Sequence, residues 1–595
     1  MTTLRIHPAT GVARLGNSDE FFVGPEQPGI PANWNVSAGR FDPFKDATGR
    51  VKRQAARFRI FEFDDAGNAI REITLADVTK IEWRVHVANR KGSFFTFNGQ
   101  RGAETDPPYS GRHAEPPDKI EKPNRGRGQP ERRNRRDAAE PNRRNLEIDP
   151  GEQAISAPGE LELVDNVTAA PIRSLGKIRM EADGRLLFFG GVGQTASSAN
   201  PAPQIEEYAN NDTWFDDVSD GVVRANVTLR DGSVISAESA WVIVGPPDFA
   251  PCIGHVVSLY ETLWDLAVRF GFAARAGGDP TLADLVAQQT AWQPATNDFA
   301  ATYRPSFTDH IYPILCRALG AQDVHQSPRA DFHATLADWV RLSAPSEARL
   351  RAEVFKRIRD PSSTVPDWLN MPRGLGDDFT SLDEFEDGRR DAPSARAFLS
   401  LTHVQYALLK AWKEGRFDSD WRFGDVRFAP VPAPGPVTPH GLDGAALENC
   451  VGGPFFPGIE VGWLIREKSL YSAAFRFRDT GMTVGPLIFQ AGFFSQQMAQ
   501  PWTADFYDCH KEDHTPDDSS EPLIYMWWTA QRPDDVLPDA QSAHRRWVEP
   551  FDASKEPSAQ GPDDITNLAR FEQMRTRWHE LSFVVLEGDS YVEQK

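Results

Sequence analysis

The two residues with the most distinctive chemistry are a cysteine and a tryptophan in the C-terminal third of the chain. Cys450 precedes Val451 and the pair Gly452-Gly453, and Trp502 follows Pro501. Glycine and proline allow sharp turns and close backbone packing, so both side chains could be held in fixed positions. A thiol and an indole that meet can be joined through a thioether bond. A cysteine that simply packs as a small hydrophobe is the ordinary alternative, and with 16 tryptophans in the chain contact by chance is common.

Several segments carry the pattern of a known enzyme family. Leu447–Glu460 contains the cysteine and Gln500–Phe506 contains the tryptophan. Further matching segments are Ile6–Ser18, Tyr208–Asp217, Gly245–Pro251, Gln531–Leu537 and Arg577–Val585. The chain resembles the cysteine tryptophylquinone-dependent amino acid oxidases, the family of the lysine ε-oxidases and glycine oxidases. The matches cover nearly the whole chain, and by them the chain is identified as a member of that family.

The resemblance implies a redox cofactor made from the chain itself, cysteine tryptophylquinone, formed from Cys450 and Trp502. Its carbonyl condenses with a primary amine and draws electrons from the amine-bearing carbon, while the protein supplies position and a base. The implied activity is an oxidase that deaminates an amino acid or related amine with O2. Its products would be an aldehyde or oxo acid, ammonia and hydrogen peroxide.

The resemblance also implies partners: a separate flavoprotein that matures the cofactor, and other copies of the chain in a homo-oligomer. It does not decide which amine or amino acid is the substrate. One alternative keeps the cofactor but changes the reaction, for example to an oxygenase of a biosynthetic pathway. Another is a non-catalytic relative in which Cys450 stays a free thiol. A third, from a different class, is a binding or scaffold protein that uses the arginine-rich segment described below.

A carboxylate is expected beside the cofactor, where it would take the proton from the α-carbon. The family places an aspartate shortly before the cysteine, but the position one helical turn before Cys450 is Ala446. We choose Asp443, which lies seven residues upstream, although Glu448 is nearer in sequence. Asp443 could equally be the N-cap of a short helix over Ala445–Asn449.

Other polar residues have competing interpretations. Tyr208 lies in a matched segment and could line the amine pocket, or it could be a half-buried core tyrosine. The carboxylates in Asp212–Asp220 lack the order of a calcium-binding loop and are expected in solvated turns. Cys509–His514 contains metal-capable groups without a second paired motif, so we expect no bound metal. Gly190–Gly193 fits a tight exit from a strand better than a dinucleotide loop.

Composition excludes several classes. A chain of 595 residues can bury more than one core, and its formal charge of −20 argues against nucleic acid or an anionic membrane as partner. No apolar run reaches the roughly 18 to 20 residues of a membrane span, and no apolar signal-peptide core follows Met1. Four widely spaced cysteines are not a disulfide framework. A cytoplasmic location is the default, and export by an unusual route stays open.

The pattern of elements predicts a mixed α+β fold. Residues 1–250 are β-rich, with strands and hairpins expected at Phe58–Phe63, Lys177–Met180 with Arg185–Phe189, Val222–Leu229 with Ser233–Ile235, and Trp241–Val244. An arginine-rich loop near 98–145 interrupts them, and we expect it to be solvated and paired with carboxylates. Helical spacing predicts a mainly helical region over 251–428, with helices at Val256–Phe270, Ile311–Leu319, Phe332–Leu342, Glu347–Arg359 and Leu401–Glu414. A Pro-rich connector, Phe423–His440, leads into 429–595, a mixed region that carries the cofactor and ends in a helix near Ile565–Trp578.

Overall fold

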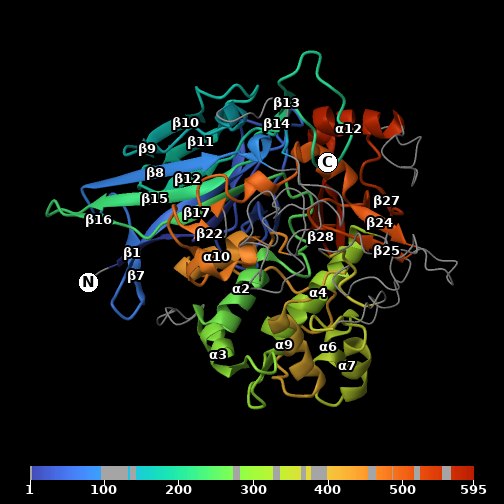
Figure 1. Cartoon of the computed structure of the whole chain (residues 1–595). Coiled ribbons are helices and arrows are strands. Elements are labelled where there is room, and N and C mark those ends of the chain that lie inside the picture. The colour runs from blue at the N-terminus through green and yellow to red at the C-terminus, as the bar shows by residue number, and fades with distance from the viewer. Residues whose placement is uncertain are drawn as a thin grey trace.

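The structure is a computed structural model of the chain (Figure 1). It describes residues 3–94, 132–134, 142–272, 282–325, 336–363, 370–376, 398–452, 464–484, 487–514, 523–551 and 565–594. The predicted mixed α+β fold, with a β-rich N-terminal half, a helical middle and a mixed C-terminal region, is confirmed. The division into domains at 250 and 428 stays a prediction.

A large sheet forms the N-terminal half. Its strands are β1 (Thr3–His7), β2 (Thr10–Arg14), β3 (Phe21–Val23), β6 (Arg53–Phe63), β7 (Ala69–Ile73), β8 (Lys80–Ala88), β9 (Gln153–Ile155), β10 (Gly159–Val164), β11 (Ser174–Met180), β12 (Leu186–Phe189), β15 (Asp220–Thr228), β16 (Val234–Ser236) and β17 (Ala240–Gly245). The main path runs β10-β11-β12-β6-β2-β17-β15-β8-β9, and β1, β3 and β7 pair with β6 while β16 pairs with β15. β17 and β2 are parallel neighbours, so β2 and the segment that leaves β17 lie together at one end of the sheet.

The hairpins form where the turn sequences predicted them. β11 pairs antiparallel with β12, with Met180 opposite Leu186, and Gly184 in the turn has a φ of +95°. Only glycine adopts such a φ without steric cost, which explains the Asp-Gly signal at this position. β15 and β16 form a second predicted hairpin. β17 has all six residues buried, as expected for a strand without polar alternation.

The helices follow the sheet in the chain. They are α2 (Leu259–Phe270), α3 (Ala283–Ala291), α4 (Tyr312–Gly320), α6 (Trp339–Leu342), α7 (Ala348–Phe355), α9 (His403–Lys413), α10 (Pro439–Leu447), α11 (Trp502–Asp508) and α12 (Ile565–Arg577). In Figure 1, α2, α3, α4, α6, α7 and α9 lie together below the sheet, and α12 lies at the upper right. Ser258 and Glu261 form a capping box that starts α2, and Gly271 ends it in the left-handed conformation.

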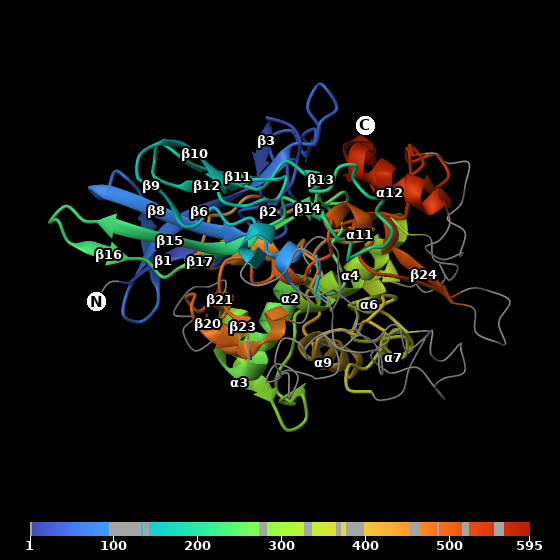
Figure 2. The same cartoon turned by 45° about the horizontal axis from the view of Figure 1, so that its top comes forward.

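Short two-stranded ribbons complete the fold. They are formed by β4 (Trp34–Asn35) with β5 (Arg40–Phe41), β13 (Thr195–Ser197) with β14 (Trp214–Asp216), β18 (Trp292–Gln293) with β19 (Asp298–Phe299), β20 (Tyr471–Ala473) with β21 (Arg476–Phe477), β22 (Thr483–Val484) with β23 (Leu487–Ile488), β24 (Lys511–His514) with β25 (Leu523–Met526), β26 (Asp535–Val536) with β27 (Arg545–Arg546), and β28 (Phe583–Glu587) with β29 (Ser590–Gln594). Figure 2 shows α11 and β24 on the side of the molecule that also carries α12. Among the described residues, none of the helices combines the length and the apolar character needed to cross a membrane.

Two local predictions are wrong. Asp443 is not a helix N-cap, because α10 starts at Pro439 and Thr438 is its cap, with Gly441 N–H donating to the Thr438 hydroxyl. Asp443 is therefore inside the helix. The arginine-rich segment is not solvated throughout: Arg133 is buried, and its Nε donates to Asn210 Oδ1 at 3.2 Å. Most of residues 98–145 lie outside the described residues.

Candidate active site

Cys450 is placed by the close approach of its segment to the start of α2. The carbonyl of Cys450 accepts Leu259 N–H at 2.8 Å, and Gly452 N–H donates to Val257 at 3.0 Å. A Cβ atom built on Gly452 would lie 1.9 Å from the Ser258 carbonyl oxygen. No residue larger than glycine fits there without movement of the backbone, so Gly452 lets the cysteine segment pack directly on α2.

The sulfur of Cys450 is buried against an arginine. Arg14 Nη2 lies 3.8 Å from Sγ and donates to the Asn449 carbonyl at 3.3 Å. The same guanidinium pairs with Asp248, with 3.6 Å between Nη2 and Oδ2. Burial raises the pKa of the Cys450 thiol to about 11, although the Arg14 charge acts against that rise. Burial also raises the pKa of Asp248, to about 6. The thiol is thus neutral near pH 7, and a fixed cation stands beside it.

Trp502 is the first residue of α11 and is fixed through its backbone. Its N–H donates to Asp216 Oδ2 at 2.8 Å. Lys91 Nζ lies 2.7 Å from the same oxygen and also donates to the Ala499 carbonyl. The indole is 1% exposed, and its Nε1 has no hydrogen-bond partner among the described residues. Asp216, from a distant part of the chain, therefore acts like an N-cap of α11, because its carboxylate accepts a free backbone N–H of the first turn.

The other end of α11 is held by Arg532. Its Nε donates to the Phe506 carbonyl at 2.5 Å, and its Nη2 donates to the Tyr507 carbonyl at 3.0 Å. These carbonyls belong to the last turn of the helix, where no backbone donor is available to them. Because both ends of α11 have fixed partners, the position of Trp502 is determined by Asp216 and Arg532 together.

The segments of the cysteine and the tryptophan meet in one buried cluster, called here the flanking cluster. It consists of Ala209, Leu375, Phe398, Val451, Ala499, Cys509, Trp527 and Trp528, with Tyr208 packed against it. Val451 follows Cys450, and Ala499 precedes Trp502 by three residues. Phe249 makes a second connection between the surroundings of the cysteine and α11. It follows Asp248 in the chain, and the centroid of its ring lies 5.8 Å from that of Phe506. The structure thus brings Tyr208 and the neighbours of both predicted cofactor residues to one place, together with two further indoles.

Asp443 lies in a different environment from the one we expected for a base. Its carboxylate is 3.1 Å from His7 Nδ1 and 3.2 Å from His440 Nδ1, and it accepts the Ala9 N–H at 2.5 Å. Burial alone would raise the pKa of Asp443, but the charges and hydrogen bonds of the two histidines outweigh it and lower the pKa far below its ordinary value. These contacts are those of a carboxylate that joins α10 to β1.

Of the four acidic residues in 212–220, Asp212 is exposed as predicted, whereas the other three are not solvated, contrary to the prediction. Asp216, Asp217 and Asp220 are buried. Asp217 accepts the N–H groups of Val192 and Gln194, and a Cβ on Gly191 would collide with its carboxylate at 2.3 Å. Burial raises the pKa of Asp217 to about 7 and that of Asp220 to about 6. They are internal acceptors that fix loops around the site.

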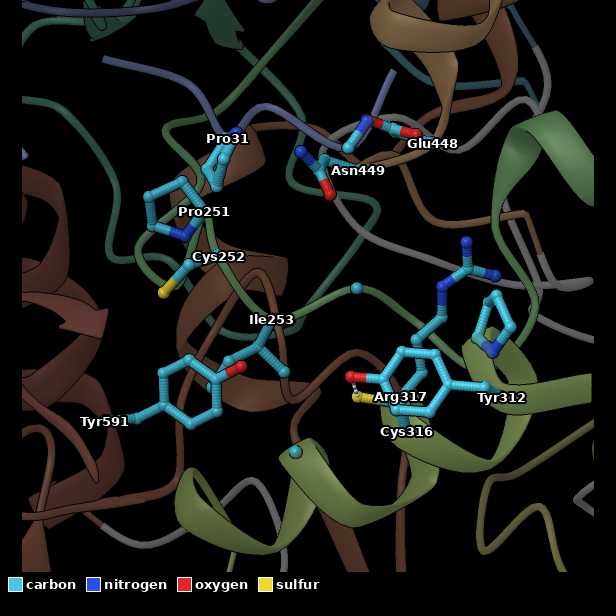
Figure 3. Close-up of a pocket in the computed structure, with 14 residues that line it drawn as sticks. Pro31, Pro251, Cys252, Ile253, Tyr312, Cys316, Arg317, Glu448, Asn449 and Tyr591 are labelled. Atoms are coloured by element: carbon cyan, nitrogen blue, oxygen red, sulfur yellow. Dashed lines mark hydrogen bonds between the residues drawn. The ribbon is translucent and has the colours of Figure 1, made fainter. Parts of the chain in front are cut away.

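A cavity of about 190 Å³ reaches the residue before the cysteine (Figure 3). Its walls come from residues 251–254, from α4 and from the end of α10, and they include Glu448 and Asn449. Burial raises the pKa of Glu448 to about 7. A concave, mostly apolar space with a few polar groups is the usual form of a small-molecule site, so this cavity is the candidate approach to Cys450.

Four residues that position the site were not predicted, namely Arg14, Asp216, Asp248 and Arg532. Each lies in a segment whose pattern matched the family. The signal for them was therefore present in the sequence, but only the fold assigns their contacts. The surroundings of the two side chains predicted to form the cofactor are compatible with a quinone made from the chain. Cys450 forms no disulfide, and the nitrogen of the buried Trp502 indole has no hydrogen-bond partner among the described residues.

Comparison with known proteins gives the class. The model of the L-lysine epsilon oxidase N-terminal domain matches residues 7–244, and that of the L-lysine epsilon oxidase C-terminal domain matches residues 383–528. Together they match more than half of the chain. The protein is an oxidoreductase that acts on the CH–NH2 group with oxygen as acceptor, an amino-acid oxidase.

The chain belongs to the L-lysine epsilon-oxidase family. It is 28% identical over 575 residues to the L-lysine 6-oxidase of Marinomonas mediterranea, an alignment that covers 85% of this chain and 71% of that protein. Its fold matches the crystal structure of the L-Lys epsilon-oxidase from Marinomonas mediterranea with a TM-score of 0.70 and 24% identity, over 100% of this chain and 94% of the other. The structure of the Schiff base intermediate of that oxidase with L-Lys matches with a TM-score of 0.72 and 23% identity, over 100% and 95% of the two chains. Membership of the family implies a protein-derived quinone cofactor.

Proposed function

We propose that the protein oxidises a primary amine of an amino acid with a cysteine tryptophylquinone made from Cys450 and Trp502. The observation that carries the proposal is the flanking cluster, to which both Val451 and Ala499 belong although they are far apart in the chain. When formed, the quinone would supply a two-electron acceptor, and turnover with O2 would release an aldehyde or oxo acid, ammonia and hydrogen peroxide.

The residues around Cys450 would control its proton. Arg14 contacts the sulfur, so its charge stabilises the thiolate as the proton leaves, in a site where burial otherwise disfavours that charge. Asp248, held by Arg14, is the carboxylate whose raised pKa suits a general base near neutral pH. Asp443 was our choice from the sequence, and its lowered pKa makes it the weaker acceptor of a proton.

The substrate would reach the site through the cavity beside Asn449. Tyr208, which is packed against the flanking cluster, would contact the amine at the site itself. The side chain of the amino acid is not selected by these contacts. A flavoprotein that matures the quinone and a homo-oligomeric assembly are further parts of the proposal, and both rest on family membership.

The proposal is tested by product analysis with a panel of amino acids that includes L-lysine and glycine. Wild-type protein is expected to release ammonia and hydrogen peroxide in equal amounts, and Cys450→Ala and Trp502→Phe are expected to release neither. Trp528→Phe, which changes another buried indole of the same cluster, is the matched control and should keep activity. Full activity in Trp502→Phe, or its loss only in Trp528→Phe, would contradict the assignment of the tryptophan.

A second candidate is a family member with another reaction, such as an oxygenase, or one without the mature cofactor. The observation that favours it is that Ala446, one helical turn before Cys450, is not a carboxylate, while Asp443 is engaged by His7 and His440. Oxygen uptake with an oxygenated amino acid as product and no ammonia would select the oxygenase. Absence of quinone redox staining would select the non-catalytic relative.

A further inference from the structure

Two groups of metal-capable side chains come together among the described residues, and they differ in how their nitrogens are used. The first group is His7, His440 and Asp443. His7 Nδ1 lies 3.1 Å from the Asp443 carboxylate, and its Nε2 lies 3.1 Å from Arg476 Nη2, which donates to it. Both ring nitrogens of His7 are therefore satisfied, and a guanidinium occupies the space where a cation would bind. This group is an ordinary hydrogen-bond network.

The second group is His325, Asp534 and Asp535, whose ligand atoms all lie within 4.8 Å of one another. His325 is 1% exposed, and within the described part of the chain neither of its ring nitrogens has a hydrogen-bond partner. Buried polar atoms are nearly always paired, so an imidazole without hydrogen bonds needs an explanation, and an ion is one of the few available.

The spacing of the donors fits a metal better than a hydrogen bond. His325 Nδ1 lies 3.5 Å from Asp534 Oδ2, beyond the roughly 2.7 to 3.2 Å of an N–H···O bond. Two ligands of a tetrahedral ion with bonds of about 2.0 to 2.1 Å are separated by about 3.3 to 3.4 Å. The imidazole and the carboxylate are thus almost as far apart as two ligands of one zinc ion.

The backbone holds this second group in place. The N–H groups of Asp534 and Asp535 both donate to the Val324 carbonyl, at 2.8 and 3.2 Å, so the residue before His325 is fastened to the two aspartates. His510 Nε2 lies 3.4 Å from Asp534 Oδ1, the other oxygen of that carboxylate. A partner on the second oxygen is what orients a metal-binding carboxylate in known sites.

The charges set the kind of ion. Two carboxylates and a neutral imidazole balance a divalent cation, and a mixed nitrogen and oxygen set suits Zn²⁺ or Mn²⁺. Arg532 is a nearby positive charge, because its guanidinium interacts electrostatically with the Asp534 carboxylate. Its hydrogen bonds go to the carbonyls of Phe506, Pro533 and Tyr507. This charge repels any bound cation, so binding depends on the two carboxylates, whose attraction is larger for a divalent than for a monovalent ion.

We propose that His325, Asp534 and Asp535 bind a divalent transition-metal ion, best matched by Zn²⁺, in a structural role. Arg532, two residues before Asp534, holds the last turn of α11. The ion would therefore fix the segment that sets the position of the helix with Trp502, while lying apart from the reacting atoms. The site does not depend on the chemistry proposed for Cys450.

The test is metal binding by the full chain. The protein is treated with a chelator and dialysed, and then Zn²⁺ or Mn²⁺ is titrated in a calorimeter while metal content is measured by mass spectrometry. We expect about one equivalent with a Kd below about 1 µM and a rise in the thermal midpoint on metal addition. His325→Asn and Asp535→Asn should each weaken binding by about 100-fold or more. His440→Asn, in the first group, is the matched control and should bind like wild type.

Two results would overturn the proposal. One is wild-type protein that takes up neither ion in stoichiometric amounts and shows no change in thermal midpoint. The other is His325→Asn and Asp535→Asn that bind with the affinity of wild type. Because the wild-type titration needs no variant, and because Asp535 is only half-buried, the test does not depend on whether His325→Asn folds. Neither readout requires oxidase activity.

Discussion

The ion pair beneath Trp502 gives a quantitative prediction. Lys91 Nζ and Asp216 Oδ2 are 2.7 Å apart, and their side chains are 2% and 0% exposed. Lys91→Met keeps the length of the side chain but leaves the Asp216 carboxylate buried without its cation. Removal of one partner of a buried pair costs about 3 to 5 kcal/mol of unfolding free energy, because an uncompensated charge stays in a low-dielectric environment. We expect Lys91→Met to be destabilised by that amount.

The double variant Lys91→Met/Asp216→Asn separates the charge from the packing. It removes both charges, so we expect it to be more stable than Lys91→Met alone, by about 1 to 3 kcal/mol. The matched control is Lys356→Met, which breaks a pair with Glu353 of nearly the same length, 3.0 Å, at the surface, where the two side chains are 69% and 51% exposed. Such pairs contribute less than about 1 kcal/mol.

The assay is urea unfolding of the full chain, followed by tryptophan fluorescence and by circular dichroism, with coincident transitions required for a two-state analysis. A second readout is the amount of Cys450 joined to Trp502 in each variant, since Asp216 accepts the Trp502 N–H. The reasoning is refuted if Lys91→Met unfolds within about 1 kcal/mol of wild type, like Lys356→Met, or if the double variant is less stable than Lys91→Met.

Three further predictions follow from other contacts. If Asp248 is the base, oxidase activity should rise as the pH increases through 6, since the pKa of Asp248 is about 6 and only the ionised carboxylate accepts a proton. Asp248→Asn should lose this pH dependence. An unchanged pH profile in Asp248→Asn would exclude Asp248 as the base. Burial lowers the pKa of His7 from 6.5 to about 4, so the unfolded chain binds more protons between these values. The free energy of unfolding should therefore be highest above pH 6.5 and should decrease as the pH drops toward 4. In urea titrations the free energy of unfolding of His7→Gln should decrease less steeply with falling pH than that of wild type. The same decrease in both proteins would contradict the prediction. Gly452→Ala places a Cβ 1.9 Å from the Ser258 carbonyl oxygen and should destabilise the protein by about 3 kcal/mol or more. The control Gly435→Ala, with no atom within 4 Å of its Cβ, should change the urea midpoint little. Similar urea midpoints for the two variants would contradict the close approach of Gly452 to α2.

Local signals in the sequence were sufficient for the elements that they specify. The Asp-Gly turns predicted the hairpins β11–β12 and β15–β16, since in each hairpin the turn directly joins two strands that are adjacent in the chain. The helix at Leu259–Phe270 follows from its apolar face and the capping box of Ser258 and Glu261. The matched segments around Cys450 and Trp502 carry the site prediction, which stays a prediction, and residues of both segments belong to the flanking cluster.

Contacts between distant parts of the chain could not be predicted in this way. Asp216 is an internal acceptor because Lys91 and Trp502, far away in sequence, fold against it. Asp443 lies inside α10 because Thr438 and Pro439 start the helix earlier than the sequence around the cysteine indicated. α11 has only seven residues, too few for a helical period to be visible, and its ends are fixed by Asp216 and Arg532. Burial and partner choice are properties of the fold, so carboxylates with the same local sequence pattern can be solvated or fully internal.

The central claim is a covalent bond between the sulfur of Cys450 and the indole of Trp502, and peptide mass spectrometry of the purified active protein tests it most directly. The account predicts that proteolysis yields one species that contains both peptides, with about two oxygen atoms gained and about four hydrogen atoms lost relative to their sum. Separate, unmodified peptides for Cys450 and Trp502, or a link from Cys450 to Trp527 or Trp528, would contradict it.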